Sequence, residues 1–420
     1  MNTTKTAVPF TGYEKFVIFI LAVTQFSVIL DFMVMSPLGD FMMKSLSLTP
    51  AQFGLSVSAY AFSAGIAGLL TAGFADSFDR KKLLLFFYVG FVVGTFFCGI
   101  ANSYQFLLIA RIITGLFGGV IGSISMAIIT DLFEINHRGM VMGFVQMGFG
   151  ASQVLGIPIG LYLANAWNWH LPFIMIAVLG AIVAIMILIK MQPVTKHLLL
   201  QHDKNALTHL WHTLTNRRYA IGFLATALLS IGGFMMMPFG AAFAINNLKI
   251  TSHQLPFLYM VSGVTALIIM PVIGKLSDKI DKFKLFAFAT GVTAIVIFFY
   301  SHLSETPLWE AMIFNILIMS AIMSRMVPAG ALVTGIPDMR ARGAFMSINS
   351  SLQQIAGGIA AAIGGMIVVQ KTKFSPLEHY TTIGYITIVI AILNTLVLYR
   401  VNKLINQDKK TEQPAILAVS

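Results

Sequence analysis

The sequence predicts an all-α membrane protein whose twelve transmembrane helices form two pseudo-symmetric halves of six helices each. Three observations support this prediction: the composition, the length of the apolar runs, and an internal repeat. Of the 420 residues, 57% are hydrophobic and 10% are charged, whereas a soluble domain has roughly 45 to 50% apolar and 25% charged residues. The chain is therefore expected to lie in a lipid bilayer.

Twelve apolar runs are long enough to cross the hydrocarbon core, which takes about 20 residues in a helix. The strands of a membrane barrel would alternate over about ten residues, and these runs are too long and too uniformly apolar for that. The predicted spans are residues 16–38, 51–74, 83–101, 104–130, 140–165, 170–190, 219–245, 256–275, 283–301, 308–333, 344–370 and 380–401.

The basic residues predict the orientation. With both termini in the cytoplasm, 21 of the 27 Lys and Arg residues lie on the cytoplasmic side and only four face outward, which is a strong positive-inside signal. The net charge of +11 needs no nucleic-acid partner, because the basic residues are spread over many loops. We expect a multi-pass protein of the inner (plasma) membrane.

Two matches between loops indicate an internal repeat at an offset of about 200 residues. The first match pairs the loops after spans two and eight: Asp76 with Asp278, Asp79 with Asp281, and Arg80 with Lys282. The second pairs the loops after spans four and ten: Arg138-Gly139 with Arg342-Gly343. The repeat predicts helix bundles over 1–190 and 219–401, a cytoplasmic linker over 191–218, and a tail over 402–420.

The linker is expected to hold an amphipathic helix on the cytoplasmic membrane surface, because apolar residues recur at helical spacing between basic flanks. These residues are Leu207, Leu210, Trp211 and Leu214. Only His209 and His212 among its histidines have ligand-like spacing, and no Cys or carboxylate pair completes a metal site. We expect neither a metal nor a cofactor.

Asp31 is the only one of the sixteen acidic residues that lies deep inside an apolar run, where a carboxylate is costly and points to function. Arg111 lies at a similar depth, since each residue is about seven positions, or roughly 10 Å, from the outer end of its span. Burial favours a protonated carboxyl and a nearby guanidinium favours an ionised one, so a pair that moves could carry protons. The alternative is a static ion pair that joins two helices.

The loop with Asp76, Arg80 and Lys81 resembles the major facilitator superfamily signature G-x-L-A-D-R-x-G-R-K, with Ala72 and Asp79 in place of its glycines. The resemblance covers the whole chain. It implies a conformational latch, in which the Asp pairs with basic residues or a helix dipole and holds the halves together in one state. A simple positive-inside turn is the alternative. The latch candidates are Asp76, Arg80, Lys81, Arg138, Asp278 and Arg342.

Within that superfamily, the first half is similar to drug:proton antiporters and sugar-efflux permeases. Arg111 followed by Gly115 matches the buried Arg motif of span four, and Gly156, Pro158 and Gly160 resemble the antiporter motif of span five. Trp169 to Phe173 resembles the family's entry to helix six, with His170 where Arg is usual. Small residues every fourth position are expected to pack closely at a rocking interface between halves. They are Gly148, Ser152, Gly156 and Gly160 in span five, and Ala356, Ala360 and Gly364 in span eleven.

The expected substrate path contains soft, aromatic and a few polar groups, which suits amphipathic compounds. Lipid-facing packing explains many of the methionines equally well, and hydrogen bonds between helices explain the amides. Arg325 could anchor an anionic group of the substrate or pair with a carboxylate when the inner gate closes. The candidates are Gln25, Phe32, Met35, Met236, Asn246, Asn315, Met323 and Arg325.

Together these features predict a secondary active transporter that exports small amphipathic or hydrophobic compounds in exchange for protons by alternating access. No ATPase motif occurs in the sequence, so an ion gradient is the expected energy source. The alternatives are efflux of sugars or other small metabolites, and import by proton symport. The expected partners are a small-molecule substrate, protons and the lipid bilayer, and the protein is expected to be a monomer and not an enzyme.

Overall fold

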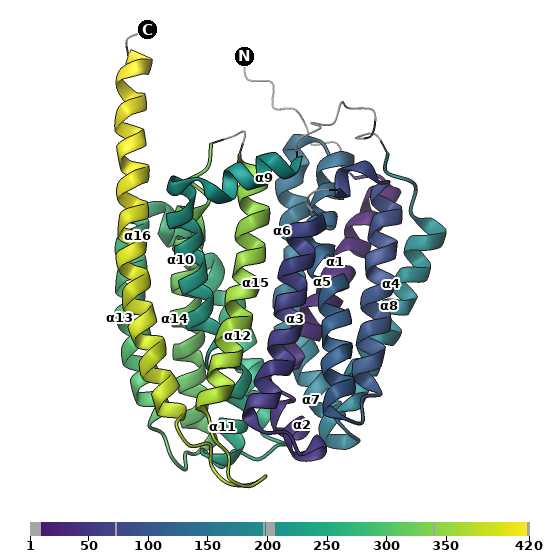
Figure 1. Cartoon of the computed structure of the whole chain (residues 1–420), viewed down its shortest axis with the longest axis vertical. Helices are drawn as coiled ribbons and strands as arrows, with labels where there is room; N and C mark the ends of the chain where they lie inside the picture. The colour runs from purple at the N-terminus through teal and green to yellow at the C-terminus, as the bar shows by residue number, and fades with distance from the viewer. Residues whose placement is uncertain (1–9, 72–73, 196–197, 199–205, 339–340, 418–420) are drawn as a thin grey trace.

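The chain folds into long helices that lie side by side, as Figure 1 shows for the computed structural model of the protein. The structure describes residues 10–71, 74–195, 198, 206–338 and 341–417. Helix α1 (Gly12–Val34) begins and α16 (Tyr380–Leu417) ends at the same end of the molecule. We call this the terminal end, and the opposite end, which holds the short helices α2 (Gly39–Leu46) and α11 (Gly240–Asn246), the far end.

The first half holds six spans, coloured purple to teal in Figure 1. Its fifth span is one helical stretch in which a π-helical turn, Ser152–Gly156, joins α6 and α7. The long helices are α1, α3 (Pro50–Thr71), α4 (Arg80–Gly99), α5 (Tyr104–Leu132), α6 (Ile135–Ala151) with α7 (Ile157–Ala166), and α8 (His170–Lys190).

The second half, coloured teal to yellow, repeats this order. Helix α9 (Ala206–Thr215) of the linker contacts α10 and α15 at the terminal end. The long helices are α10 (Arg217–Phe234) continued by α11, α12 (Leu255–Lys279), α13 (Lys282–Ser301), α14 (Leu308–Val333), α15 (Arg342–Ile367) and α16.

The twelve-helix membrane fold predicted from the sequence is confirmed. Within the described residues, eleven helical segments are long and apolar enough to cross a membrane. Helix α15 is the twelfth long helix, and it falls outside that set because Ser, Asn, Gln and Gly residues lower its hydropathy. It is still a bundle helix, since it packs against α3 and α10.

Two spans differ from their predicted form. The first apolar run extends to residue 38, but α1 ends at Val34 and a turn leads into α2. Span five, predicted as one helix over 140–165, contains the π-helical turn Ser152–Gly156 shortly before Pro158. Proline has no N–H to donate to the carbonyl four residues earlier, so the helix widens at this point.

The matching residues Asp79 and Asp281 of the internal repeat have the same local role, since each caps the start of a helix. Asp79 caps the N-terminus of α4, because its side chain accepts a hydrogen bond from the Lys81 N–H at 2.9 Å. Asp281 caps α13 in the same way, accepting from the Lys284 N–H at 2.9 Å. Short acidic side chains are among the preferred N-caps, since they satisfy backbone donors that have no partner within the helix.

Gly148, Gly156 and Gly160 of span five pack against α1 of the same half and not at the interface between halves, so the prediction is wrong for these three residues. A Cβ on Gly148 would lie 3.0 Å from the backbone nitrogen of Phe26 in α1, and a Cβ on Gly160 would lie 3.0 Å from Val34 of the same helix. Both glycines therefore serve close packing inside the first half. A repeat of four residues faces the nearest neighbouring helix, which here belongs to the same bundle.

The interface between the halves uses other glycines. On α3, a Cβ on Gly54 would lie 2.6 Å from the Ala361 oxygen, and on α15 a Cβ on Gly365 would lie 2.7 Å from the Pro50 oxygen. Helix α12 meets the π-helical turn, where a Cβ on Gly263 would lie 2.9 Å from the backbone of Gln153. Backbones of the two halves can approach closely because these positions carry no side chain.

Candidate functional site

Asp31 and Arg111 meet, as the sequence predicted. Arg111 Nη1 donates to Asp31 Oδ2 at 2.9 Å, and both side chains are fully buried, with 0% exposure. Asp31 is three residues from the end of α1, and Arg111 is near the start of the antiparallel α5. The two helices therefore bring the charges to the same level, nearer the far end. The pair lies inside the first half rather than between the halves.

Three further side chains complete the surroundings of the pair, and the sequence did not single them out for this role. The Thr95 hydroxyl donates to Asp31 Oδ1 at 3.0 Å. The Arg111 guanidinium carbon lies 4.5 Å from the ring centre of Tyr60. Cys98 is buried, and its Sγ lies 3.7 Å from the Thr114 hydroxyl beside the pair. Polar residues inside apolar spans were the signal that could have identified Thr95 and Tyr60.

Two of the nitrogen donors of Arg111 form no hydrogen bond with the described part of the chain in this state. Its Nε and Nη2 are buried and have no hydrogen-bond partner among the described residues. Asp31, by contrast, accepts a hydrogen bond at each of its two oxygens. The Tyr60 ring offers its negative face to the guanidinium, a contact worth about 2 kcal/mol or more when it is desolvated. This arrangement lets Arg111 retain a favourable contact if the carboxyl becomes neutral.

Gly115 explains how Tyr60 comes so close to Arg111. A Cβ at this position would collide with the backbone oxygen of Tyr60. The glycine one turn after Arg111 therefore allows α5 to lie directly against α3. The spacing that resembles the family's buried Arg motif thus has a packing reason here.

The far end holds a polar contact between the halves that the sequence did not predict. Asn246 of α11 donates through Nδ2 to Asp40 Oδ1 of α2 at 2.6 Å. Lys44 forms an ion pair with Asp40 at 2.7 Å. Asp40 is buried, since only 4% of it is exposed. We call Asp40, Lys44 and Asn246 the far-end closure.

More contacts between the halves surround the far-end closure. Ser36 donates to the backbone oxygen of Met237, Asn165 donates to the oxygen of Ser252 at 2.9 Å, and Lys373 donates to the oxygen of Lys44 at 3.0 Å. At mid-height, Ser58 donates to the oxygen of Gly358 at 2.7 Å. These side-chain hydrogen bonds between the two six-helix bundles lie at the far end and at mid-height. This state is therefore closed at the far end.

The predicted substrate residues fall into two groups. Phe32 lies between the halves, with ring centres 5.2 Å from Tyr60 and 5.7 Å from Phe234, while Asn246 belongs to the far-end closure. Gln25 and Met35 belong to the first predicted span, as Phe32 does, and Met236 belongs to the seventh, which leads into Asn246.

The second group lies on α14 in the second half. Asn315 accepts from the Ser262 hydroxyl at 3.2 Å and donates to the Ala311 oxygen at 2.9 Å, so it joins α12 to α14. Met323 and Arg325 are buried further along the helix. Within the described residues, no aromatic, ionic or hydrogen-bond contact joins this group to Phe32, and substrate binding by either group stays a prediction.

The predicted latch residues contact their own halves in this state. Arg80 Nε donates to Asp131 Oδ2 at 3.1 Å, and Lys81 Nζ donates to the Leu188 oxygen at 3.0 Å. Arg138 donates to the Phe133 oxygen at 2.9 Å. Asp278 is exposed near the end of α12. The side chain of Asp76 is outside the described residues.

Arg138 and Arg342 share one structural role. Arg138 Nη2 donates to the Thr130 oxygen at 2.6 Å, at the end of α5. Arg342 Nη2 donates to the Thr334 oxygen at 3.5 Å, at the end of α14. A cation at a helix C-terminus satisfies free carbonyls and interacts favourably with the helix dipole. The repeat of these two arginines therefore caps equivalent helices in the two halves.

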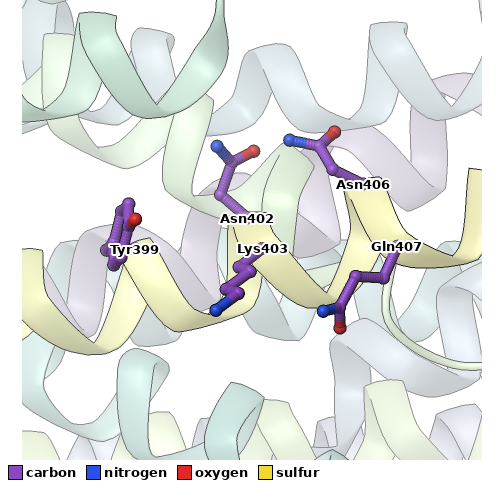
Figure 2. Close-up of a pocket in the computed structure, with 5 residues that line it drawn as sticks. All are labelled: Tyr399, Asn402, Lys403, Asn406 and Gln407. Atoms are coloured by element: carbon purple, nitrogen blue, oxygen red, sulfur yellow. The ribbon is translucent and has the colours of Figure 1, made fainter.

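A hollow along α16 offers little to a ligand. It is lined by Tyr399, Asn402, Lys403, Asn406 and Gln407. All five residues come from one helix, and in Figure 2 the two asparagines point to one side of it while Lys403 and Gln407 point to the other. These side chains do not converge on one point, so we assign no site here.

Comparison with known proteins identifies relatives across the whole chain. The family model described as "Major Facilitator Superfamily" matches residues 21–309 and 222–418. The "Uncharacterized MFS-type transporter YbcL" of Bacillus subtilis (strain 168) is 26% identical over 390 residues, which cover 91% of this chain and 95% of that protein. The "Probable sugar efflux transporter" of Helicobacter acinonychis (strain Sheeba) is 23% identical over 363 residues, covering 86% and 87%.

A solved structure has the same fold. It is described as a bacterial homolog to the human lysosomal transporter Spinster, in an inward-facing and unoccupied conformation. The two structures align with a TM-score of 0.78 at 16% identity, over 95% of this chain and 99% of the other. At this identity the likeness concerns the fold alone.

Proposed function

Because the chain belongs to the Major Facilitator Superfamily, and is therefore a membrane transporter and not an enzyme, we propose that it exports small amphipathic compounds in exchange for protons. The observation that carries this proposal is the fully buried pair of Asp31 and Arg111. A carboxylate in a membrane span is costly and is retained where it serves transport or binding. The pair supplies one site that can exist with or without a proton.

The proton step follows from the contacts of Asp31. While Arg111 Nη1 and the Thr95 hydroxyl donate to its two oxygens, the ionised form is stabilised. When helix motion withdraws Arg111, burial favours the protonated form. Arg111 then keeps its contact with the Tyr60 ring. Proton uptake and release at Asp31 are in this way linked to the conformation of the first half.

Alternating access would use the two ends of the molecule. With both termini in the cytoplasm, as the basic residues favour, the far-end closure seals the side that faces out of the cell. Opening it requires Asn246 to leave Asp40. The loops with Arg80, Arg138, Asp278 and Arg342 would then close the cytoplasmic side as the latch, and Asp76 is the acidic member proposed from the sequence.

The class of substrate is proposed from the residues at mid-height. Phe32, Phe234 and Met236 offer aromatic and polarisable surface between the halves, which suits amphipathic compounds. A sugar would need many hydrogen-bond partners, and these side chains provide none. Sugar efflux is retained as the second candidate because the relative from Helicobacter acinonychis carries that description over 86% of this chain.

Transport in proteoliposomes with an imposed pH gradient tests the proposal. The panel should contain cationic, neutral and anionic amphiphiles together with sugars. We expect uptake against a gradient of an amphiphile when protons flow the other way, and loss of that uptake in Asp31→Asn. Uptake that persists after the pH gradient is collapsed would rule out proton coupling, and uptake of sugars alone would favour the second candidate.

A further inference from the structure

Arg325 carries a buried charge that its own surroundings do not balance. It is 5% exposed, and its Nε and Nη2 have no hydrogen-bond partner among the described residues. Its guanidinium carbon lies 5.4 Å from the ring centre of Phe286 in α13. A cation–π contact is weaker than the cost of burying an unpaired charge. Phe286 therefore compensates the charge only in part.

The sequence of the second half leaves no carboxylate that could pair with Arg325. No acidic residue occurs between Glu310, which is 15 positions or roughly 20 Å away along α14, and Asp338, which lies beyond the end of α14 and accepts from the Tyr219 hydroxyl at 3.4 Å. None occurs in the stretches 217–277, 282–304, 342–377 or 379–407. Asp278 is exposed near the end of α12, and Asp281, at the start of α13, accepts from the Lys284 N–H at 2.9 Å as a helix cap.

The first half cannot supply the missing charge either. Its only deep carboxylate, Asp31, is bound to Arg111 and lies towards the far end. Arg325 is eight residues from Val333, where α14 ends at the terminal end. Asp131 of α5 lies only one residue from its own helix end and is bound to Arg80. In this state, neither of these two carboxylates is paired with Arg325.

We propose that Arg325 is an anion-binding site whose counter-charge is a singly charged anion from outside the chain. This favours the first of the two roles that the sequence left open for Arg325, since no carboxylate of the described residues pairs with it. The anion can be the carboxylate of a transported amphiphile or a free halide. Only the first of these sources rests on the proposed transport function; the site itself does not.

Thermal stability of the purified full chain tests the site. Melting is measured at constant ionic strength in gluconate, a bulky hydrophilic anion, and then with chloride or benzoate replacing part of it. We expect the melting temperature to rise and saturate with one of these anions in the wild type, because a ligand that binds the folded state stabilises it. We expect Arg325→Met to lose this rise. Lys275→Met, which removes an exposed cation of α12, should keep it.

Two further results decide the outcome. In gluconate alone, Arg325→Met should melt at or above the wild type, because it removes an unbalanced buried charge; a clearly lower value would make Arg325 a packing element and overturn the proposal. A rise that persists in Arg325→Met, or no rise with any anion in the wild type, would also overturn it.

A benzoate response together with loss of carboxylate transport in Arg325→Met identifies the substrate as the source, and a chloride response alone identifies a bound halide. Absence of pH-driven flux would contradict the transport proposal and leave the anion response intact.

Discussion

Replacing Asp31 with Asn separates a proton carrier from a static ion pair by the size of the stability loss. Asn has the shape of the carboxyl and the neutral charge of its protonated form. In a static pair, Arg111 would be left buried without its partner, and such a loss costs about 3 to 5 kcal/mol. Both side chains are fully buried at 2.9 Å, so solvent cannot reduce that cost.

A proton carrier must reach the neutral state in every cycle. A group that exchanges protons within about one pH unit of its surroundings has charged and neutral forms within about 1.4 kcal/mol of each other. The protein must then hold an arrangement that tolerates neutral Asp31, and the Tyr60 ring beside Arg111 is suited to it. We therefore expect Asp31→Asn to lower the free energy of unfolding by less than about 2 kcal/mol while it abolishes proton-coupled flux.

The assay is reversible unfolding of the purified protein in mixed micelles, combined with flux in proteoliposomes from the same preparation. Asp31→Asn/Arg111→Met is the matched control, because it removes both charges and should lack coupling whatever the stability result. A loss of 3 kcal/mol or more in Asp31→Asn, with flux that falls only in proportion to folded protein, would refute the carrier role. Normal pH-driven flux in Asp31→Asn would refute it outright.

Four other substitutions test the remaining parts of the structure. Arg111→Lys keeps the charge but loses the planar guanidinium, so coupled flux should fall more than the melting temperature, and a melting defect alone would indicate a structural pair. Asp40→Asn should weaken the far-end closure and raise labelling of cysteines introduced near it from outside, and unchanged labelling would contradict a gating role. Asp76→Asn should raise labelling of cysteines along α6 and α12 from the cytoplasm, and equal labelling would reduce that loop to a topology signal. Gly115→Ala should destabilise the protein by about 1 to 3 kcal/mol through overpacking against α3, measured by unfolding, whereas Gly143→Ala, with no atom within 4 Å of its Cβ, should not.

The sequence was sufficient for the membrane class and the twelve-helix fold, because the bilayer imposes one rule on every span. Backbone groups must be satisfied within the segment and side chains must be apolar, so composition and length identify the helices. The meeting of Asp31 and Arg111 followed from the same geometry, since two antiparallel spans of known depth place their residues at the same level. Repeated capping by Asp79 and Asp281 also depends on local sequence alone.

The tertiary structure decided which helix faces meet, and no local pattern contains that information. A stripe of glycines indicates close packing but not the partner, so the stripe of span five faced α1 instead of the second half. The far-end closure joins Asp40 and Asn246 across 206 positions of sequence, and only the placement of the two halves shows that these residues meet. Arg325 could be recognised as unbalanced only when its neighbours were known, because the cost of a charge depends on what surrounds it in the folded protein.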